Sequence, residues 1–242
     1  MNGGRDGRPR HEQIAADLRA RIMSGDLPAG SRLPSIPTLV QQFDAATATV
    51  QRALAALKAE GLLHSEVGKG VFVRHRQALP IEAMAYVAPS TGDYSYHLLR
   101  VAEVVPPADV ARELELDADE RAVLRHRILR HRGEPVELSW SYYPSSIAVG
   151  TELAERRKIS GGAPRVLAEI GHAQQRMSDH VSARMPTTEE IETLNLPGYV
   201  PVLRQLRVIR SAAGRPVEVS VLVKGSHLHE LRYEQTIVDG TS

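Results

Sequence analysis

The chain contains no cysteine among its 242 residues. This absence excludes disulfide bonds, thiolate metal sites and cysteine nucleophiles, and it fits a reducing compartment. No stretch approaches the roughly 20 apolar residues that a membrane-spanning helix needs. The chain starts with MNGGRDGRPR, which is polar and lacks the apolar core of a secretory signal. We therefore expect a soluble cytoplasmic protein.

Motifs of catalysis are also missing. The sequence has no glycine-rich phosphate loop, no HExxH motif and no paired nucleophile and base. The histidines lack metal-ligand spacing, so we expect His126, His131, His227 and His229 on the surface and not around a metal. The sequence therefore predicts neither an enzyme nor a protein with a cofactor.

A strong net charge is absent too, since 30 basic residues stand against 29 acidic ones. The charges are unevenly placed. Residues 1–76 hold eleven Lys and Arg against seven Asp and Glu, whereas the remainder holds nineteen against twenty-two. A basic front and an acidic rear indicate two parts with different tasks, with a polyanionic partner at the front. The length fits two ordinary domains, and 42% apolar residues suffice for their cores.

Helical periodicity predicts three helices in the first part of the chain. The first covers residues 12–24, and Gly25 follows as a natural C-cap. A loop rich in proline leads to Ser35, whose hydroxyl can N-cap a short second helix. The third is expected over residues 47–60. Two β-prone runs around residues 68–70 then predict a hairpin, so the elements follow the order of a winged helix-turn-helix.

The third predicted helix has small and hydrogen-bonding residues at its N-terminal end, which suits an approach to the DNA major groove. A glutamine offers two hydrogen bonds to adenine. We therefore predict that Gln51 reads an A·T pair and that Arg52 and Lys69 bind phosphates. A solvated Gln51, or an Arg52 held in a surface salt bridge, is the alternative.

Residues 12–73 resemble the DNA-binding domain of GntR-family transcription regulators. The matching pieces are IAADLRARIMSGDLPAGSRLPS, TVQRALAALKAEGLL and GKGVFV, in this order. The resemblance implies a dimer on a palindromic operator, with the glycine of the wing in the minor groove. Relatives commonly carry arginines where this chain has Pro37, Thr47 and Gln51, so those contacts do not transfer. The predicted DNA-binding residues are Ser35, Thr38, Thr47, Thr49, Gln51, Arg52, Gly68, Lys69 and Gly70.

The rear part contains an internal repeat. VLRHRILRHRGEPVELSWSYYP (123–144) parallels VLRQLRVIRSAAGRPVEVSVLVKG (202–225), and a short helical segment precedes each copy. The turns are expected at residues 133–135 and 214–216. Two units of helix and hairpin predict a pseudo-twofold α+β domain with an antiparallel sheet. Between them TELAERRKISGGAPRVLAEIGH is expected to be mostly helical, and SHLHELRYEQTI is expected to add helix or turn and a final strand.

This rear part resembles the UTRA effector-binding domain of the HutC subfamily, whose fold is like that of chorismate lyase. EVVPPADVARELEL, GEPVELSWSYYP, VLAEIGH, PVLRQLRVI and GRPVEVS carry the likeness. It implies a small effector, often anionic. Arg127 matches the first arginine of the family's Arg-x-Arg strand, Leu129 replaces the second, and Arg125 on the same strand face is a substitute; a less anionic or bulkier ligand follows. The predicted effector-binding residues are Arg125, Arg127, Glu137, Tyr142, Glu218 and Tyr233.

The predicted organisation is a winged helix-turn-helix domain over residues 1–76 with an N-terminal arm, a linker over 77–95, and an effector-binding and dimerisation domain over 96–242. The favoured function is a homodimeric transcriptional repressor controlled by a small molecule. A ligand-independent DNA binder, architectural or for plasmid maintenance, whose rear domain only dimerises is the alternative. Enzymatic use of the lyase-like fold is disfavoured because no catalytic set is found.

Overall fold

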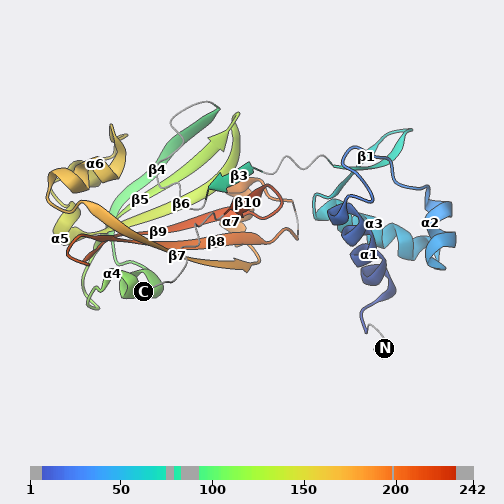
Figure 1. Ribbon diagram of the computed structural model, residues 1–242, viewed down its shortest axis with the longest axis horizontal. Helices are drawn as coiled ribbons and strands as arrows, with labels where there is room; N and C mark the ends of the chain where they lie inside the picture. Colours follow the sequence, from blue (N-terminus) through green and yellow to red (C-terminus); the bar gives the residue numbers. More distant parts are fainter. Residues whose placement is uncertain (1–6, 75–78, 83–92, 198, 233–242) are drawn as a thin grey trace, which may run out of the picture. The chain divides into compact units, whose positions relative to one another are not determined.

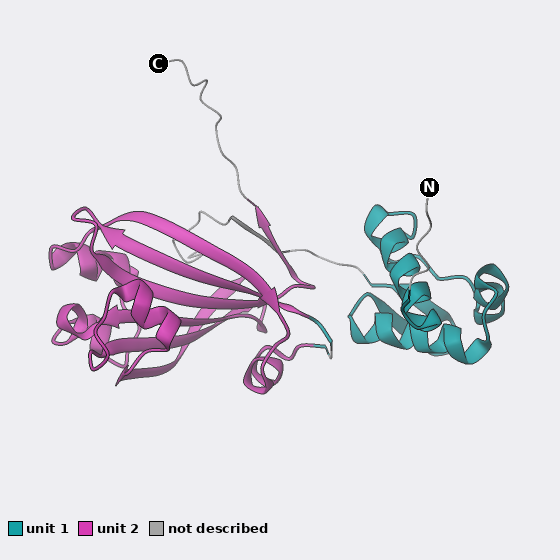
Figure 2. Ribbon diagram, turned by 90° about the horizontal axis from the view of Figure 1, so that it is seen from below, with its two compact units in different colours: residues 1–79, 197–200 teal, residues 80–196, 201–242 magenta. Residues whose placement is uncertain are grey.

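The structure is a computed structural model that describes residues 7–74, 79–82, 93–197 and 199–232. It divides into two compact units, drawn in different colours in Figure 2. The first unit comprises residues 1–79 and 197–200, and the second comprises residues 80–196 and 201–242. Each has hydrophobic clusters of its own, so each is described by itself.

The first unit consists of three helices and a β-hairpin (Figure 1). The elements are α1 (Arg10–Ser24), α2 (Ile36–Phe43), α3 (Thr47–Ala59), β1 (Leu63–Glu66) and β2 (Gly70–Val73). This order confirms the predicted winged helix-turn-helix fold. Helix α1 begins two residues earlier than the periodicity indicated, which is a common uncertainty at helix ends.

Local capping explains where these helices begin and end. Gly25 closes α1 with φ of 87°, a conformation that costs glycine little. The Ser35 hydroxyl accepts a hydrogen bond from the Thr38 amide at the start of α2, as predicted. Asp44 follows α2 with φ of 44°, and Asp is among the few non-glycine residues that tolerate this left-handed region. The chain therefore turns sharply and begins α3 three residues later.

The core of the first unit draws on every one of these elements. Leu18 of α1, Leu39 of α2, Leu57 of α3 and Leu63 of β1 are at most 1% exposed. Burying one such leucine contributes about 1.5–3 kcal/mol. The inward stripe of α3 fixes its rotation about its own axis, and the opposite side of the helix is left at the surface.

The second unit is built around a six-stranded antiparallel sheet of order β4-β5-β6-β9-β8-β7 (Figure 1). Its strands are β4 (Tyr94–Val104), β5 (Ala122–His131), β6 (Glu134–Pro144), β7 (Gln174–Arg184), β8 (Val202–Ser211) and β9 (Pro216–Gly225). The helices are α4 (Ala108–Leu114), α5 (Ser145–Ala148), the 3-10 helix η1 (Glu152–Ala154), α6 (Gly162–Glu169) and α7 (Thr188–Leu194). A separate two-stranded sheet pairs β3 (Leu79–Glu82) with β10 (His229–Arg232).

The strand order confirms the predicted pseudo-twofold repeat. The first copy runs β4-α4-β5-β6 and the second runs β7-α7-β8-β9, and β6 pairs with β9 at the centre. Each copy therefore begins with a strand, β4 or β7, that the repeat predicted from the sequence did not include. The fold as a whole is α+β, as expected.

Several local predictions need correction. The first hairpin turns at Arg132 and Gly133, and Glu134 and Pro135 already belong to β6. Only half of residues 151–172 is helical, because only η1 and α6 form there. Strand β3 and the start of β4 lie within residues 77–95, the predicted linker. Residues 229–232 form a strand after a turn, which agrees with the expected turn and final strand in this stretch.

The two faces of the six-stranded sheet differ in chemistry. Helices α4 and α7 cover one face, where they pack on apolar side chains such as Leu124, Leu138 and Val219. We call it the α4/α7 face. On the other face α5, η1 and α6 cover only one end, around Val123 and Tyr143. The rest of that face carries polar side chains, which are buried except for the half-buried Arg127, and we call it the polar face. Its members are Arg125, Arg127, Glu137, Ser139, Ser141, Gln205, Arg207, Glu218, Ser220 and Lys224.

Candidate DNA-binding and ligand-binding sites

The N-terminal end of α3 presents the predicted polar residues at the surface. Gln51 and Arg52 are exposed, whereas Val50 and Ala53 beside them are fully buried. Within the described part of the chain, the side chains of Gln51 and Arg52 make no hydrogen bond or ion pair. The alternative prediction, in which a surface salt bridge holds Arg52, is therefore not seen in the described part of the chain. The side chains of Gln51 and Arg52 are both available to a partner.

The start of α2 places further predicted residues at the surface. Ser35 and Thr38 are both exposed, and their hydroxyl oxygens lie 2.7 Å apart. The amide of Thr38 donates to the Ser35 hydroxyl at 3.3 Å. Amides of a first helical turn point outward and favour an anion such as a phosphate. Ser35 and Thr38 therefore cap the start of α2 and are also exposed at its surface.

The hairpin β1–β2 forms the wing, with an exposed tip at residues 67–69. Gly68 and Gly70 have φ of 75° and 121°, values that side chains rarely allow, so the turn requires glycine at both positions. Lys69 is exposed and its ammonium lies 3.0 Å from the carboxylate of Glu66. Such an exposed pair is worth at most about 1 kcal/mol, so a phosphate can replace Glu66 as the partner of Lys69.

Arg32 is a cation of the wing that the sequence prediction missed. Its backbone bridges to Phe72 of β2, and its guanidinium lies so close to Gly70 that a Cβ there would be 2.9 Å from Arg32 Nε. Arg32 is exposed and has no hydrogen-bond or ion-pair partner among the described residues. The sequence placed it in a loop, and only the bridge to β2 brings it beside the wing.

In the second unit a chain of hydrogen bonds crosses the polar face. The Arg127 guanidinium donates to the Ser141 hydroxyl at 2.6 Å, and the hydroxyls of Ser141 and Ser220 lie 2.6 Å apart. Ser220 in turn donates to the carboxylate of Glu218 at 2.7 Å. The chain therefore links the two halves of the repeat across the β6–β9 pair, with a cation at one end and a carboxylate at the other.

Two buried ion pairs flank this chain. Lys224 Nζ lies 2.9 Å from the carboxylate of Glu137, and both side chains are less than 10% exposed. Arg207 holds Asp179 through two parallel hydrogen bonds of 2.8 and 2.9 Å. Buried charges of this kind are retained only when they are paired, because each has lost its hydration. The polar face thus concentrates charge where a purely structural sheet would carry apolar side chains.

Three buried polar atoms on this face have no hydrogen-bond partner among the described residues. They are Arg127 Nε, Ser139 Oγ and Gln205 Nε2. Buried polar groups are nearly always hydrogen-bonded, because a buried group without a hydrogen bond destabilises the fold by about 1–3 kcal/mol. Unpartnered donors gathered on one face are what a binding site presents before its ligand arrives. The Arg127 guanidinium also lies 5.6 Å from the centre of the Tyr96 ring, which orients it.

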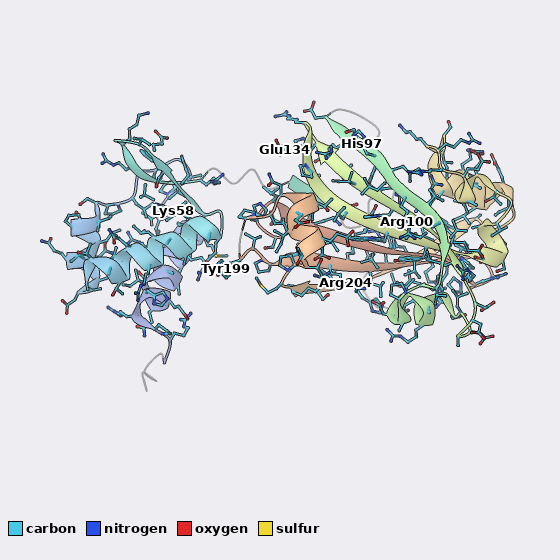
Figure 3. The ribbon with its side chains drawn as sticks, turned by 180° about the vertical axis from the view of Figure 1, so that it is seen from behind. Lys58, His97, Arg100, Glu134, Tyr199 and Arg204 are labelled. Atoms are coloured by element: carbon cyan, nitrogen blue, oxygen red, sulfur yellow. The ribbon has the colours of Figure 1, made fainter. Side chains whose placement is uncertain are left out.

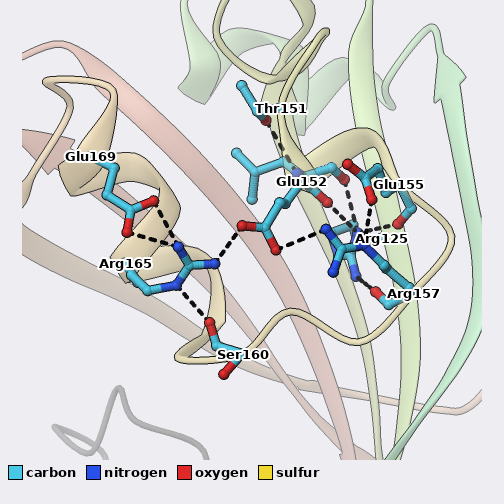
Figure 4. Close-up of polar contacts among 9 residues, drawn as sticks. Arg125, Thr151, Glu152, Glu155, Arg157, Ser160, Arg165 and Glu169 are labelled. Carbon is cyan, nitrogen blue, oxygen red and sulfur yellow. Dashed lines mark hydrogen bonds and ion pairs between the residues drawn. The ribbon is translucent and has the colours of Figure 1, made fainter.

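Arg125 serves a different purpose from Arg127, although both point to the polar face. Its guanidinium donates to backbone carbonyls of Leu153, Glu155 and Arg157 at 2.7–2.9 Å (Figure 4). Burial lowers the pKa of Arg125, and these carbonyls compensate for part of its lost hydration. The geometry therefore favours Arg125 as the residue that holds the segment around η1, and not as an effector ligand.

A network of exposed ion pairs completes that segment. Glu152 lies between Arg165 and Arg157, at 2.6 and 3.3 Å, and Arg165 also binds Glu169 (Figure 4). The Arg165 guanidinium further donates to the carbonyl of Ser160 at 2.7 Å. These contacts explain how residues 151–161 keep a fixed path without regular helix.

Tyr142 does not join the other predicted effector residues. It points to the α4/α7 face, where it packs with Leu124 and Val219. There, with Trp140, it lines a depression between α4 and α7 that also contains Arg204, which is ion-paired to Asp109. Arg204 is labelled in Figure 3. Alternation along β6 places Tyr142 on the opposite side of the sheet from Glu137.

Of the other predicted effector residues, Glu137 and Glu218 lie on the polar face with Arg127, and Tyr233 is outside the described residues. The sequence reading missed Ser139, Ser141, Gln205, Arg207 and Lys224. The period of two along each strand was the signal that could have found them, because every second residue from Glu137 or Glu218 shares its face.

Among the described residues, no three His, Asp or Glu side chains are grouped so that they could hold a metal ion. In the same part of the chain, no helix is long and apolar enough to cross a membrane. An exposed winged helix-turn-helix and a separate domain with a buried polar site define a transcription regulator with a DNA-binding and an effector-binding domain.

Comparison with known proteins identifies the family. Residues 10–73 match the GntR family of bacterial regulatory proteins, and residues 90–226, more than half of the chain, match the UTRA domain. The chain belongs to the GntR family of transcription regulators that carry a UTRA domain, an arrangement consistent with the HutC subfamily. These families consist of regulators and not of enzymes.

The relatives match this chain over most of their length. An uncharacterised HTH-type regulator of Streptomyces coelicolor, SCO4628, is 26% identical over 96% of this chain and 94% of its own. The regulator GgaR of Escherichia coli K12 is 26% identical over 89% and 87%. Among solved structures, a GntR-family regulator covers 96% of this chain and 99% of its own with a TM-score of 0.69 at 23% identity. PhnF of Mycobacterium smegmatis covers 92% and 99% with a TM-score of 0.55 at 17% identity, which shows the shared fold.

Proposed function

We propose that this regulator is a repressor that binds a palindromic operator as a homodimer and is released by a small effector. It acts in the cytoplasm, where bacterial DNA lies. The end of α3 enters the major groove, where Gln51 reads an A·T pair and Arg52 binds a phosphate. The wing, with Lys69 at its tip and Arg32 beside it, approaches the neighbouring backbone. The boundary between the two functions falls within residues 77–95.

The observation that carries effector control is the set of unpartnered donors on the polar face. A domain that served only for dimerisation would have no reason to leave the Ser139 hydroxyl and the Gln205 amide nitrogen buried without partners, in residues that are 1% and 2% exposed. This observation favours effector control over the alternative of a DNA binder without a ligand. If an effector weakens DNA binding, DNA must weaken effector binding by the same factor.

Selection of bound DNA from a random pool tests the DNA-binding part of the proposal. We expect an inverted repeat whose half-site spacing reflects a dimer. Equal retention of every sequence and of scrambled competitor in low salt would overturn it. Sedimentation of the protein with the selected duplex then tests the expected ratio of two chains per operator.

A metabolite screen with the selected operator tests effector control. A compound that raises the melting temperature and also releases the operator supports a repressor. A compound that tightens DNA binding would overturn release as the mode of control. A rear domain that no compound affects would favour the ligand-independent alternative.

A further inference from the structure

The charges on the buried part of the polar face do not balance. Among the described residues the face carries four cations and three carboxylates, which leaves one positive charge. The cations are Arg125, Arg127, Arg207 and Lys224, and the carboxylates are Glu137, Asp179 and Glu218. An uncompensated charge is expensive away from water, so a ligand that completes the site should carry a single negative charge.

Arg127 is the cation that remains available to that ligand. Arg207 and Lys224 each hold a carboxylate directly, and Arg125 is engaged by backbone carbonyls. Arg127 donates to a neutral hydroxyl, that of Ser141, and its Nε–H has no partner in the described part of the chain. A carboxylate oxygen fits this free donor better than a neutral acceptor does, because charge-assisted hydrogen bonds are the stronger ones.

The free donors lie in one row across the sheet. Arg127 pairs with Ser139, Ser139 pairs with Leu222, and Leu222 pairs with Gln205, on β5, β6, β9 and β8. Neighbouring strands are about 4.8 Å apart, so one carboxylate can bridge Arg127 and Ser139. Gln205 then offers its free amide to a further acceptor oxygen. Leu222 within the row and Leu98 beside it give the rest of the ligand an apolar floor.

A phosphate monoester fits this site poorly. Its second negative charge would exceed the one uncompensated cation and would face the carboxylates of Glu137 and Glu218 on the same surface. Phosphate sites usually combine several arginines, lysines or free backbone amides. Here Arg125, the second arginine of the strand, is already occupied by carbonyls.

We propose that the effector is a small organic monocarboxylate with at least one further acceptor oxygen, whose carboxylate binds Arg127 and Ser139. The inference rests on the proposed function, since it names the class of ligand that controls the regulator. Gln205 selects the second oxygen, and the leucines of the row contact the carbon skeleton.

A panel of matched compounds tests the proposal with the full-length protein. Each short monocarboxylate, with and without hydroxyl groups, is compared with the amide and the phosphate monoester of the same skeleton. Melting temperature and calorimetric affinity are measured for every compound. We expect stabilisation by carboxylates with a further oxygen and little by the amides or phosphates. Stronger stabilisation by phosphate monoesters, or none by any carboxylate, would overturn the proposal.

Single substitutions test whether the carboxylate binds to the row of free donors. Arg127→Gln and Ser139→Ala should each weaken the best carboxylate about tenfold or more, as expected for a lost hydrogen bond to a charged group. Arg130→Gln makes the same change on the same strand outside the row and should leave the affinity unchanged. An unaltered affinity in folded Arg127→Gln protein, checked by circular dichroism, would contradict the assignment.

The outcomes also separate this inference from the proposed function. If a phosphate monoester stabilises the protein and releases operator DNA, effector control stands and the assigned ligand class fails. If no compound of any class changes either the melting temperature or DNA binding, effector control fails as well, and the assigned class fails with it.

Discussion

The ion pair between Glu137 and Lys224 gives the sharpest test of the polar face. Lys224 Nζ lies 2.9 Å from Glu137 and 3.2 Å from the side-chain oxygen of Gln205. The two residues are 6% and 1% exposed. Glu137→Gln removes the negative charge at almost constant volume, and Lys224 is then left buried without a counter-charge.

The size of the effect follows from that burial. Breaking a buried pair by removing one partner costs about 3–5 kcal/mol, a large part of the ~5–15 kcal/mol that stabilises a typical domain. In a domain of the size of the second unit, 1 kcal/mol shifts the melting temperature by about 2–4 °C. The variant should therefore melt roughly 6–20 °C lower.

The double variant Glu137→Leu/Lys224→Met distinguishes a lost partner from lost packing. Replacing both charges by apolar side chains is often neutral or stabilising, so we expect most of the stability to return. Glu66→Gln is the matched control, since it breaks the exposed pair with Lys69 and should cost about 1 kcal/mol or less.

Scanning calorimetry of the full-length protein without ligand is the measurement. A loss below about 1 kcal/mol for Glu137→Gln would refute the reasoning, because it would mean that Lys224 reaches water or another anion. So would a double variant as unstable as the sum of its two single changes, since the two sites would then be independent.

Three further predictions concern the DNA-binding surface and the response to pH. Gln51→Ala should relax the preference at one base pair of each half-site by about 1–3 kcal/mol; equal weakening on every sequence would contradict base reading. Lys69→Ala should instead weaken all sequences and lower the salt slope by about one, measured by fluorescence anisotropy in a salt series. Burial lowers the pKa of His126 to about 4, whereas an unfolded histidine titrates near ~6.5. The unfolded chain therefore takes up the proton first, and the stability contributed by neutral His126 is lost as the pH falls from about 6.5 to 4. His126→Phe, which keeps a ring beside Trp140, should reduce this loss in urea titrations at several pH values, and the exposed His97→Phe should not; identical curves for wild type and His126→Phe would count against it.

Much of the architecture was readable because it depends on local signals. The cap at Ser35, the glycine after α1 and the apolar stripe of α3 act over a few residues, and each predicted its element correctly. The repeat was visible because its two hairpins share turn chemistry. The stretch after η1 was misread, since its residues favour helix while Arg125 fixes them in another path through their carbonyls.

The candidate sites were predicted unequally for a physical reason. Gln51 and Arg52 project from a helix whose rotation is set by its own apolar stripe, so the sequence alone exposes them. The polar face depends on which strands pair and in what register. A shift of one residue would move Glu137 and Ser139 to the α4/α7 face.

The sequence by itself determined the order of elements in the first unit, the division into two functional parts and the residues at the tip of α3, because short-range propensity and periodicity specify them. Only the tertiary structure decided that Arg125 binds the chain itself while Arg127 keeps a free donor, that Tyr142 lies on the opposite side from Glu137, and that Arg32 joins the wing. Those outcomes depend on contacts between residues far apart in the chain, and the energy of each contact exists only once the strands have paired.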